Sequence, residues 1–524
     1  MAKIRTKPTF KEYTQNQPTF LPLSLDELIA PGHLVRVVDK VVEKMDISSL
    51  LNLYLGGGTS SYHPRMLLKV LLYAYSSKIY TGRKIARALN QDIHFMWLSG
   101  KSHPDFRTIN SFRSSKAKEV IEDLFKEMLL FLMEHQYIKM ENYFNDGSTF
   151  AADANRHKMV WKKNAERFKQ ATESKCLELF DQIDELNQSE DKQYGKQDLE
   201  ENGAKATITP EAIEKQVERL NQKIKKATDK QTERKAKTLK KELEKEAVKL
   251  TKYDSQIDTA GSRGGYSKTD EDATGMRMKN DELLPAYNIM AGCEEQFITG
   301  VSVHQNTNDG TCLIPHLKSI ETQQPQQPKN IIADSIFGTE QNYQHLEDNE
   351  IGNYMKFPQY HNEQTKKHKE NIFHKDNFHY NPDTDSYTCP NNQQLTLQKE
   401  YLQENERTGF KSTLKEYACG DCSQCPLYAQ CCKSETGGNR TITINLNLER
   451  HKQKARENLK SKDGEVLRKK RSIEIESCFG DIKHNMGFRR FHLRGKDNVK
   501  TEITIVAMAH NIRKLQIIGQ KAAA

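Results

Sequence analysis

The feature that most constrains the fold is a change of hydrophobic pattern after residue 265. Apolar residues there stop recurring every three or four positions and form short runs. YNIMAG (287–292) and FITGVSV (297–303) predict a hairpin of two strands, and FNDGSTF (144–150) predicts an earlier strand. Because strands and helices then alternate, we predict an α/β sheet. Its other elements are a helix at 311–320, the strand NIIAD ending at Asp334, a helix at 339–349 and the strand NYMKF at 353–357.

A long polar segment separates the first of these strands from the others. Between 157 and 262 the chain is dominated by Lys, Glu, Gln and Asn, which explains much of the mean hydropathy of −0.82. Two apolar strips with helical spacing predict an antiparallel helical hairpin inserted into the sheet domain. Its charges indicate a solvated face; alternatively, its Lys-rich second arm lies along DNA. The strips are Cys176, Leu179, Ile183 and Leu186, and Ile213, Val217, Leu220 and Ile224.

Residues 1–135 are predicted to form a module of short helices. Within its GRKIAR segment, Arg83, Lys84 and Arg87 are expected to lie exposed beside an apolar face. Short helices that carry basic residues suit contact with DNA. The alternative interpretation is a helical dimerisation or packing domain, and both interpretations fit this segment.

The composition limits the class of protein. A chain of 524 residues accommodates two to four domains, or one domain with large insertions, and its net charge of +9 is compatible with a polyanionic partner. The longest apolar stretches, such as MLLFLM at 128–133, are far shorter than the roughly 20 residues of a membrane helix. The N-terminal sequence also has no apolar segment of a signal peptide. We therefore expect a cytoplasmic protein with no membrane partner.

The cysteines form one group in the sequence. Six of the ten cysteines lie between 389 and 432, and a cytosolic chain keeps its thiols reduced, so their spacing predicts a metal site. A structural zinc ion needs four ligands, and more than four candidates are present. The alternative is a loop of reduced thiols without metal. The first candidate set is Cys389, Cys422, Cys425 and Cys431, in a zinc ribbon-like insertion, and Cys419 competes for one of the four places.

Three acids stand where a phosphoryl-transfer site for nucleic acids would need them. Asp146 lies in the first predicted strand, Asp334 ends a later strand, and Glu476 lies on the predicted helix RSIEIESCFGDIK. Two Mg²⁺ or Mn²⁺ ions need one bridging carboxylate and one further carboxylate each, so three converging acids are the minimum ligand set. Lys483 follows Glu476 by seven residues, or two helical turns, and is predicted to bind phosphate beside it.

Other acids compete with these three. Asp309, in NTNDG, is expected to be a turn or cap residue and is the main competitor for the second catalytic position. Asp270 and Asp272 are candidates for a supporting role behind the metal ligands, and Asp153 also lies near the first strand. His492 and Arg494 are expected to grip DNA or pack their loop rather than to act as acid and base.

Several blocks of this sequence resemble, in order, those of DDE-type bacterial insertion-sequence transposases, specifically the insertion sequence 1182 group. The segments LIAPGHLVRVVD, YHPRMLLKVLLYAYSSKIYTGRKIARAL and HPDFRTINSFR resemble that group's N-terminal helical module. The resemblance covers about 450 residues. The other blocks are NDGSTFAADANRHKMVWKKN, TDEDATGMRMKND, PAYNIMAG, NIIADSIFGTEQNYQHLE and RSIEIESCFGDIKHNMGFRRFHLRG.

The resemblance implies a transposase that cuts the ends of an insertion sequence and transfers them into target DNA. It implies an RNase H-like catalytic core with Asp146, Asp334 and Glu476 as its acids. The expected cofactors are two Mg²⁺ or Mn²⁺ ions per active site and a structural zinc ion. The expected partners are the terminal inverted repeats, target DNA and at least one further copy of the chain on the paired ends. Action on DNA implies a nucleoid-associated bacterial protein.

The chain departs from the motif of related transposases around Glu476. That motif places Tyr, Arg and Lys around the Glu, but here Lys469 replaces the Tyr and Arg471 lies one residue too far from Glu476, whereas Lys483 matches. The second block reads ADSIFG where relatives usually carry ADAGYG, and the Asp is retained. The candidate DNA- or phosphate-binding residues are Lys483, Arg471, Arg490, Arg494, Arg83, Lys84 and Arg87.

Two other functions remain open from the sequence: a non-catalytic, transposase-derived DNA-binding protein, and an RNase H-like nuclease without strand transfer. The intact set of three acids favours an enzyme over the first alternative. The predicted division of the chain is a helical DNA-binding module (1–135), the first core strand (136–156), a helical insertion (157–262), the continued core (263–358), a Cys-rich insertion (359–462) and the C-terminal catalytic and core helices (463–524).

Overall fold

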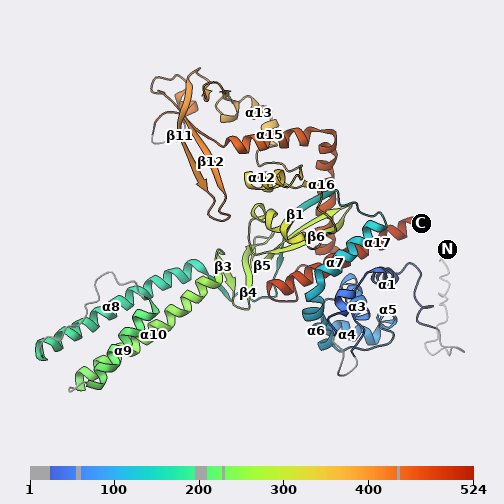
Figure 1. Cartoon of the computed structure of the whole chain (residues 1–524), viewed down its shortest axis with the longest axis horizontal. Coiled ribbons are helices and arrows are strands. Elements are labelled where there is room, and N and C mark those ends of the chain that lie inside the picture. Colours follow the sequence, from blue (N-terminus) through green and yellow to red (C-terminus); the bar gives the residue numbers. More distant parts are fainter. Residues whose placement is uncertain (1–23, 55–60, 195–208, 227–229, 433–436, 524) are drawn as a thin grey trace, which may run out of the picture.

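A computed structural model describes residues 24–54, 61–194, 209–226, 230–432 and 437–523 of the chain (Figure 1). A mixed α/β sheet occupies the middle, and a cluster of helices near the N-terminus packs beside it. The long helices after β2 and the hairpin of β11 and β12 project away from this body. The predicted α/β sheet and the helical N-terminal region are therefore both present. The domain boundaries proposed above remain predictions.

The described residues between 34 and 134 form short helices. α3 begins with Pro64 in its first turn, where the missing N–H of proline is not needed. A π-helical turn, Phe112–Lys116, separates α6 from α7. The helices are α1 (Leu34–Lys44), α2 (Ser48–Leu51), α3 (Pro64–Ser76), α4 (Gly82–Gln91), α5 (Ile93–Leu98), α6 (Phe106–Ser111) and α7 (Ala117–Glu134).

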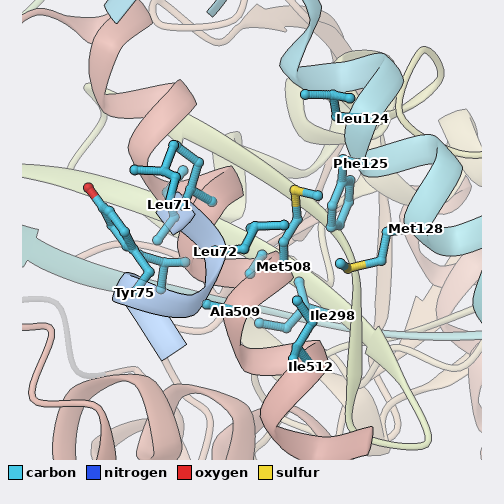
Figure 2. Packing of buried hydrophobic residues seen from close by; sticks show 14 of the residues in the cluster. Leu71, Leu72, Tyr75, Leu124, Phe125, Met128, Ile298, Met508, Ala509 and Ile512 are labelled. Atoms are coloured by element: carbon cyan, nitrogen blue, oxygen red, sulfur yellow. The ribbon is translucent and has the colours of Figure 1, made fainter. Parts of the chain in front are cut away.

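The last helix, α17 (Lys496–Ala523), joins the N-terminal helices to the sheet. It contacts α1, α3 and α7 as well as β6, and all residues from 501 to 512 are buried. A helix that is enclosed on every side needs apolar or small residues all round, which explains the run ITIVAMA. Figure 2 shows Met508 of α17 among Leu72 of α3 and Phe125 of α7. The N-terminal helices and the sheet thus share one hydrophobic core.

The central sheet combines antiparallel and parallel strands. Its order is β2-β3-β4-β5-β1-β7-β8, and β6 also pairs with β5. β5 runs antiparallel to β1 and β6, whereas β1, β7 and β8 are parallel. β8 is shorter than the predicted strand NYMKF. The strands are β1 (Asn142–Ala151), β2 (Met159–Trp161), β3 (Gly265–Ser267), β4 (Asp270–Arg277), β5 (Leu283–Glu294), β6 (Phe297–His304), β7 (Asn330–Ile332) and β8 (Gly352–Asn353).

Helices connect the later strands of the sheet. α11 (Leu313–Ile320) and α12 (Glu340–Asp348) follow β6 and β7, close to their predicted positions. Both contribute to a second core that contains Leu317 and Leu346 and also Leu459 of α15. The short 3₁₀ turns η2 (Asp309–Thr311) and η3 (Ser335–Phe337) precede these helices.

The polar segment after β2 forms three helices rather than the predicted two-helix hairpin. α8 (Lys162–Tyr194) carries the first apolar strip and α9 (Pro210–Lys226) carries the second. α10 (Lys230–Ala260) contacts both of them and supplies Leu239, Leu243 and Leu250 to their common core. Two strips alone bury too little surface to hold so long an arm, and the third strip, on α10, was missed in the sequence.

The segment before the C-terminal helices contains a second sheet, ordered β13-β12-β11-β10-β9. Its longest pair, β11 and β12, is the hairpin that projects in Figure 1. α15 (Leu446–Lys460) and α16 (Lys462–Gly480) then lead back to the central sheet. The elements of the second sheet are β9 (His379–Asn381), β10 (Ser386–Thr388), β11 (Gln394–Glu404), β12 (Lys411–Cys419) and β13 (Thr441–Ile444), with the short helices α13 (Lys366–Lys369) and α14 (Tyr428–Cys431).

No helix in the described ranges combines the length and the apolar character needed to cross a membrane.

Candidate active site

The register of two parallel strands brings the first two predicted acids together. Phe144 of β1 pairs with Ile332 of β7, so the same register extended by two residues sets Asp146 opposite Asp334. Asp146 is still within β1, whereas Asp334 lies just beyond β7 and precedes the turn η3. Side chains at the carboxyl ends of neighbouring parallel strands emerge at the same edge of the sheet.

The third acid comes from α16, which contacts β1, β5 and β7. Ile475 and Cys478 of this helix are buried against the sheet, which fixes the rotation of the helix. Glu474 is also buried, and its Oε2 accepts a hydrogen bond from the backbone N–H of Gln296 at 2.5 Å. Glu476 is left exposed near the edge that carries Asp146 and Asp334.

One guanidinium group lies between all three acids. Nη1 of Arg471 is 3.9 Å from Oδ2 of Asp146. Nη2 of the same side chain is 3.8 Å from Oδ2 of Asp334 and 3.4 Å from Oε1 of Glu476. The Arg471 side chain is only 14% exposed, and its Nη1 is buried without a hydrogen-bond partner. The three predicted acids therefore surround a single positive charge, although the sequence motif gave no reason to expect Arg471 there.

Asp146 is the most buried of the three acids. Burial raises its pKa to about 6, and the charges of Asp309 and Asp334 act in the same direction. The backbone N–H of Gly147 and the charge of Arg471 oppose this rise in the pKa. Asp146 is thus held in a partly dehydrated position, where a nearby cation would stabilise its charged form.

The carboxyl group of Asp309 lies beside Gly147, the residue after Asp146. A Cβ atom added to Gly147 would come within 2.6 Å of the Asp309 carboxyl group, so only glycine allows this approach beside Asp146. The amide of Asn288 donates a hydrogen bond to Asp309, while the cap of the η2 turn is Asn308. Asp309 is thus a turn residue, as expected, because it begins the η2 turn, but it is not the cap. Its carboxylate also lies beside Gly147, and its charge acts on Asp146.

Asp270 and Asp272 accept hydrogen bonds from the loop that precedes α17. Asp270 accepts hydrogen bonds from the Tyr287 hydroxyl at 2.9 Å and from the backbone N–H of Gly495 at 3.2 Å. Asp272 accepts a hydrogen bond from the backbone N–H of Lys496 at 2.8 Å. Their contacts hold this loop, so a role directly behind the three acids does not follow from the structure.

Lys483 does not continue the face of Glu476 as the spacing predicted. α16 ends at Gly480 and a π-helical turn, Asp481–Asn485, follows it, so the α-helical period no longer applies. The ammonium group of Lys483 instead donates to Oγ of Ser148 and to the carbonyl oxygen of Thr149, each at 2.7 Å. It therefore lies beside β1, close in sequence to Asp146. Burial lowers its pKa to about 8.

Arg490 and Arg494 both reach Asp153, which follows β1. Nη2 of Arg490 is 3.0 Å from Oδ1 of Asp153, and Nε of Arg494 is 3.0 Å from Oδ2. Both arginines remain more than half exposed. His492 instead packs its ring near Tyr80, with the ring centroids 5.4 Å apart.

The basic residues of α4 are exposed as predicted. Arg83, Lys84 and Arg87 face solvent, while Ile85 and Leu89 on the opposite side of the helix are buried.

Lys356 is a residue of the site that the sequence analysis missed. Burial lowers its pKa, and its charge interacts with those of Asp334 and Arg471. A lysine inside the apolar segment NYMKF was the available signal.

All six clustered cysteines line one pocket. Cys389 follows β10, Cys419 ends β12, and Cys431 ends α14, with Cys422, Cys425 and Cys432 between or beside them. Burial raises the pKa of Cys419 to about 11. Among the residues that the structure describes, no three of these thiols lie within 4.8 Å of one another. The predicted ligands therefore line the same pocket, but the structure does not indicate which four of them would bind a zinc ion.

Two family models match separate parts of the chain. The one described as "Transposase domain (DUF772)" matches residues 23–115, and the one described as "Transposase DDE domain" matches residues 388–516. The second range includes Arg471, Glu476 and Lys483. These two matches indicate a DDE-type insertion-sequence transposase. Comparison with curated proteins and with solved structures finds no match.

The two matches agree with the site in the structure. The N-terminal match covers α1 to α6, and the C-terminal match covers the cysteine pocket and the helix of Glu476. The order of the two domains is typical of the insertion sequence 1182 group. A DDE transposase has an RNase H-like catalytic fold, acts on DNA and uses divalent metal ions, in agreement with the mixed α/β sheet and its carboxylates.

Proposed function

We propose that this transposase cuts DNA at the ends of an insertion sequence and transfers those ends into target DNA at the site formed by Asp146, Asp334 and Glu476. The observation that carries the proposal is the convergence of these acids on Arg471, within 3.4–3.9 Å. Acids from two strands and a helix meet there, although they are far apart in sequence.

The donor set fits hard divalent cations. Its ligands are carboxylate oxygens, which Mg²⁺ and Mn²⁺ prefer. The buried Nη1 of Arg471, which has no hydrogen-bond partner, is a donor that suits an anionic acceptor such as a phosphate oxygen. Asp146, the most buried acid, would hold the ions together with Asp334 and Glu476. The ions, when bound, would activate the attacking oxygen and stabilise charge on the phosphate that is cut.

Residues of the chain would position the DNA around these acids. Lys483 uses two of its three N–H donors on Ser148 and Thr149, which leaves one for a phosphate oxygen. Arg490 and Arg494 are exposed beside the end of β1 and would contact the DNA backbone. The exposed side chains of Arg83, Lys84 and Arg87 would bind DNA on the helical module. Arg471 would move from the acids to a phosphate once cations replace its charge.

The experiment that tests the proposal is a cleavage assay. Supercoiled plasmid that carries the terminal repeats is incubated with the full chain in Mg²⁺ or Mn²⁺, and the 3′ ends are mapped. Breaks at the repeat ends support a transposase, whereas unspecific nicks would favour the RNase H-like nuclease. Binding to the repeats without any breaks would favour the non-catalytic DNA-binding protein.

A change at Arg471 should alter metal affinity without DNA present. Arg471→Gln removes a positive charge that competes with cations for three carboxylates, and such near-surface interactions amount to about 1 kcal/mol. We expect Mn²⁺ to bind about fivefold more tightly, measured by calorimetry. Lys470→Gln, which removes the neighbouring exposed charge on α16, should leave the affinity unchanged. Weaker binding after Arg471→Gln would show that Arg471 supports the metal site instead of competing with it.

DNA binding should weaken as the pH rises through about 8. The pKa of Lys483 is lowered to about 8 by burial, so this side chain loses its charge over that range, whereas exposed lysines keep theirs. Loss of one charged hydrogen bond of about 1.5 kcal/mol corresponds to about tenfold in affinity. Lys483→Arg should remove this pH dependence, because arginine stays charged. A wild-type affinity that is constant from pH 7 to 9 would exclude Lys483 from phosphate binding.

The cysteine pocket is proposed to hold one structural zinc ion. The first candidate ligands are Cys389, Cys422, Cys425 and Cys431, with Cys419 as the competitor, and all of them line the pocket. Replacing Cys422 and Cys425 together with Ser should release one zinc ion per chain, measured on protein purified under reducing conditions. Equal zinc content in this variant and the wild type would mean that the pocket holds reduced thiols only.

The remaining proposals concern assembly. Transposition joins two DNA ends, so we propose that at least two copies of the chain act on the paired ends. The arm formed by α8, α9 and α10 projects from the body and is free to take part in this pairing (Figure 1).

The proposed place of action is the nucleoid, in the bacterial cytoplasm. The predicted domain division at 135, 156, 262, 358 and 462 is retained as part of this proposal.

A further inference from the structure

A second group of metal-ligand side chains lies outside both the acidic site and the cysteine pocket. His368, His374 and Asp376 each offer one ligand atom, and these atoms all lie within 4.8 Å of one another. His368 is on α13, His374 precedes a 3₁₀ turn, Lys375–Asn377, and Asp376 lies within that turn. Neither the cysteine spacing nor the three acids drew attention to this segment.

The distances in this group suit a tetrahedral ion. Nε2 of His368 is 3.5 Å from Oδ2 of Asp376, and Nδ1 of His374 is 3.4 Å from the same oxygen. These separations are long for hydrogen bonds. A tetrahedral ion that holds nitrogen and oxygen ligands at about 2.0–2.2 Å separates neighbouring ligand atoms by about 3.4 Å. These two separations are those of neighbouring ligands around one ion, and all three ligand atoms lie within 4.8 Å of one another. An ion bound to Nδ1 of His374 would replace the long hydrogen bond, 3.4 Å, that this atom accepts from the backbone N–H of Asp376.

The protein leaves a ligand atom of this group unpaired. Nε2 of His368 is buried and has no hydrogen-bond partner, while the His368 side chain as a whole is 14% exposed. An unpaired buried ring nitrogen is unfavourable for folding unless another group engages it. A metal ion that accepts the lone pair of this nitrogen would remove that penalty.

Local hydrogen bonds hold the backbone of this segment in place. The side-chain amide of Asn377 donates to the carbonyl oxygens of His368 and Asn371, at 2.8 and 2.9 Å. Lys375 donates to the carbonyl oxygen of Thr443, at 3.0 Å, which ties the segment to β13. A pocket of about 370 Å³, lined by His368, Asp376 and Arg456 among others, opens beside the group and would admit water as a fourth ligand.

We propose that His368, His374 and Asp376 bind one Zn²⁺ or a similar imidazole-preferring divalent metal, separate from the cysteine pocket. Two imidazoles and one carboxylate, without thiolate, favour such ions over Mg²⁺. The site would fasten the segment 366–377 beside the cysteine pocket, because Phe373 of this segment lines that pocket and its carbonyl oxygen accepts a hydrogen bond from Arg440. The proposal is independent of the catalytic assignment.

Cobalt spectroscopy on the full chain tests this proposal. Co²⁺ is added to the Cys422→Ser, Cys425→Ser variant in excess Mg²⁺, which occupies oxygen-only sites. We expect one equivalent of Co²⁺ with tetrahedral absorption bands and no thiolate charge-transfer band. His368→Ala or Asp376→Asn should weaken this binding at least 100-fold, since loss of a direct ligand exceeds the roughly 10–100-fold effect of losing a supporting residue. His379→Ala, which removes an exposed histidine nearby, is the matched control and should bind as before.

Zinc analysis of the chain with all its cysteines is the second readout. His374→Ala and Asp376→Asn should each contain one zinc ion fewer than the wild type and the His379→Ala control. Asp376→Asn preserves the size of the side chain, so it decides the question if an alanine variant does not fold. Equal zinc content and equal Co²⁺ affinity in Asp376→Asn and the wild type would overturn the proposal.

Discussion

Asp146→Asn, Asp334→Asn and Glu476→Gln should each lower cleavage of repeat-containing DNA by at least about 1,000-fold. Each change removes a proposed metal ligand, and metal ions contribute several kcal/mol to stabilising the transition state, which corresponds to this factor. Binding to the repeats should change by less than about threefold, because phosphate contacts to basic residues supply most of the affinity. Cleavage is measured by initial rates on plasmid DNA, and binding by gel shift.

Substitutions of two further acids serve as a control and as a test of the competing assignment. Glu465→Gln changes an exposed acid in the first turn of α16 and should cleave at the wild-type rate. Asp309→Asn changes the acid beside Gly147 and should have a smaller effect than Asp334→Asn. If Asp309→Asn were inactive and Asp334→Asn active, Asp309 would replace Asp334 as the second catalytic acid.

Phe125→Ala should lower the free energy of unfolding by about 3–5 kcal/mol, the usual cost of removing a buried phenyl ring. Phe125 is fully buried in the core that α3, α7, α17 and the central sheet share (Figure 2). Because that core is continuous, urea should unfold the N-terminal helices and the sheet in one transition. The measurement is denaturant unfolding followed by circular dichroism and by tryptophan fluorescence, with Trp161→Phe in the background so that Trp97 of α5 reports on the N-terminal helices.

The matched control is Leu130→Ala, on the same helix. Leu130 is 40% exposed, so its replacement should cost far less than that of Phe125. The shared core also predicts that a fragment of residues 1–135 does not fold cooperatively, because its apolar surface against α17 would be exposed to water. Cooperative folding of this fragment, or two well-separated transitions in the full chain, would contradict the shared core.

The sequence was sufficient to predict the strands that build the active site. The runs YNIMAG, FITGVSV and NIIAD are strands because they are apolar, short and rich in β-branched residues, and these properties are local. The register of β1 with β7, which sets Asp146 opposite Asp334, depends on pairing between distant segments. The positions of the acids and the resemblance to known transposases both led us to expect that these two acids meet, but neither predicted this strand pairing.

Arg471 and Lys483 were predicted as phosphate-binding residues, but their contacts depend on distant segments and were not predicted. Arg471 lies one residue outside the known motif, yet its long side chain still reaches all three acids. Lys483 was placed by assuming an unbroken α-helix, and the π-helical turn after Gly480 rotates it toward β1. The group of His368 and His374 had a spacing signal in KHKENIFHKD, but its meaning depends on how that loop folds back.

The central claim is that one acidic site both cuts DNA ends and joins them to a target. The most direct measurement uses a short duplex of the terminal repeat that already ends in a 3′-hydroxyl, incubated with target plasmid, Mg²⁺ and the full chain. Strand transfer requires no prior cleavage in this assay. The account predicts covalent joining of the duplex to the plasmid by the wild type, and none by Asp146→Asn. Equal joining by the wild type and Asp146→Asn, or wild-type nicking of the plasmid without any joined product, would contradict it.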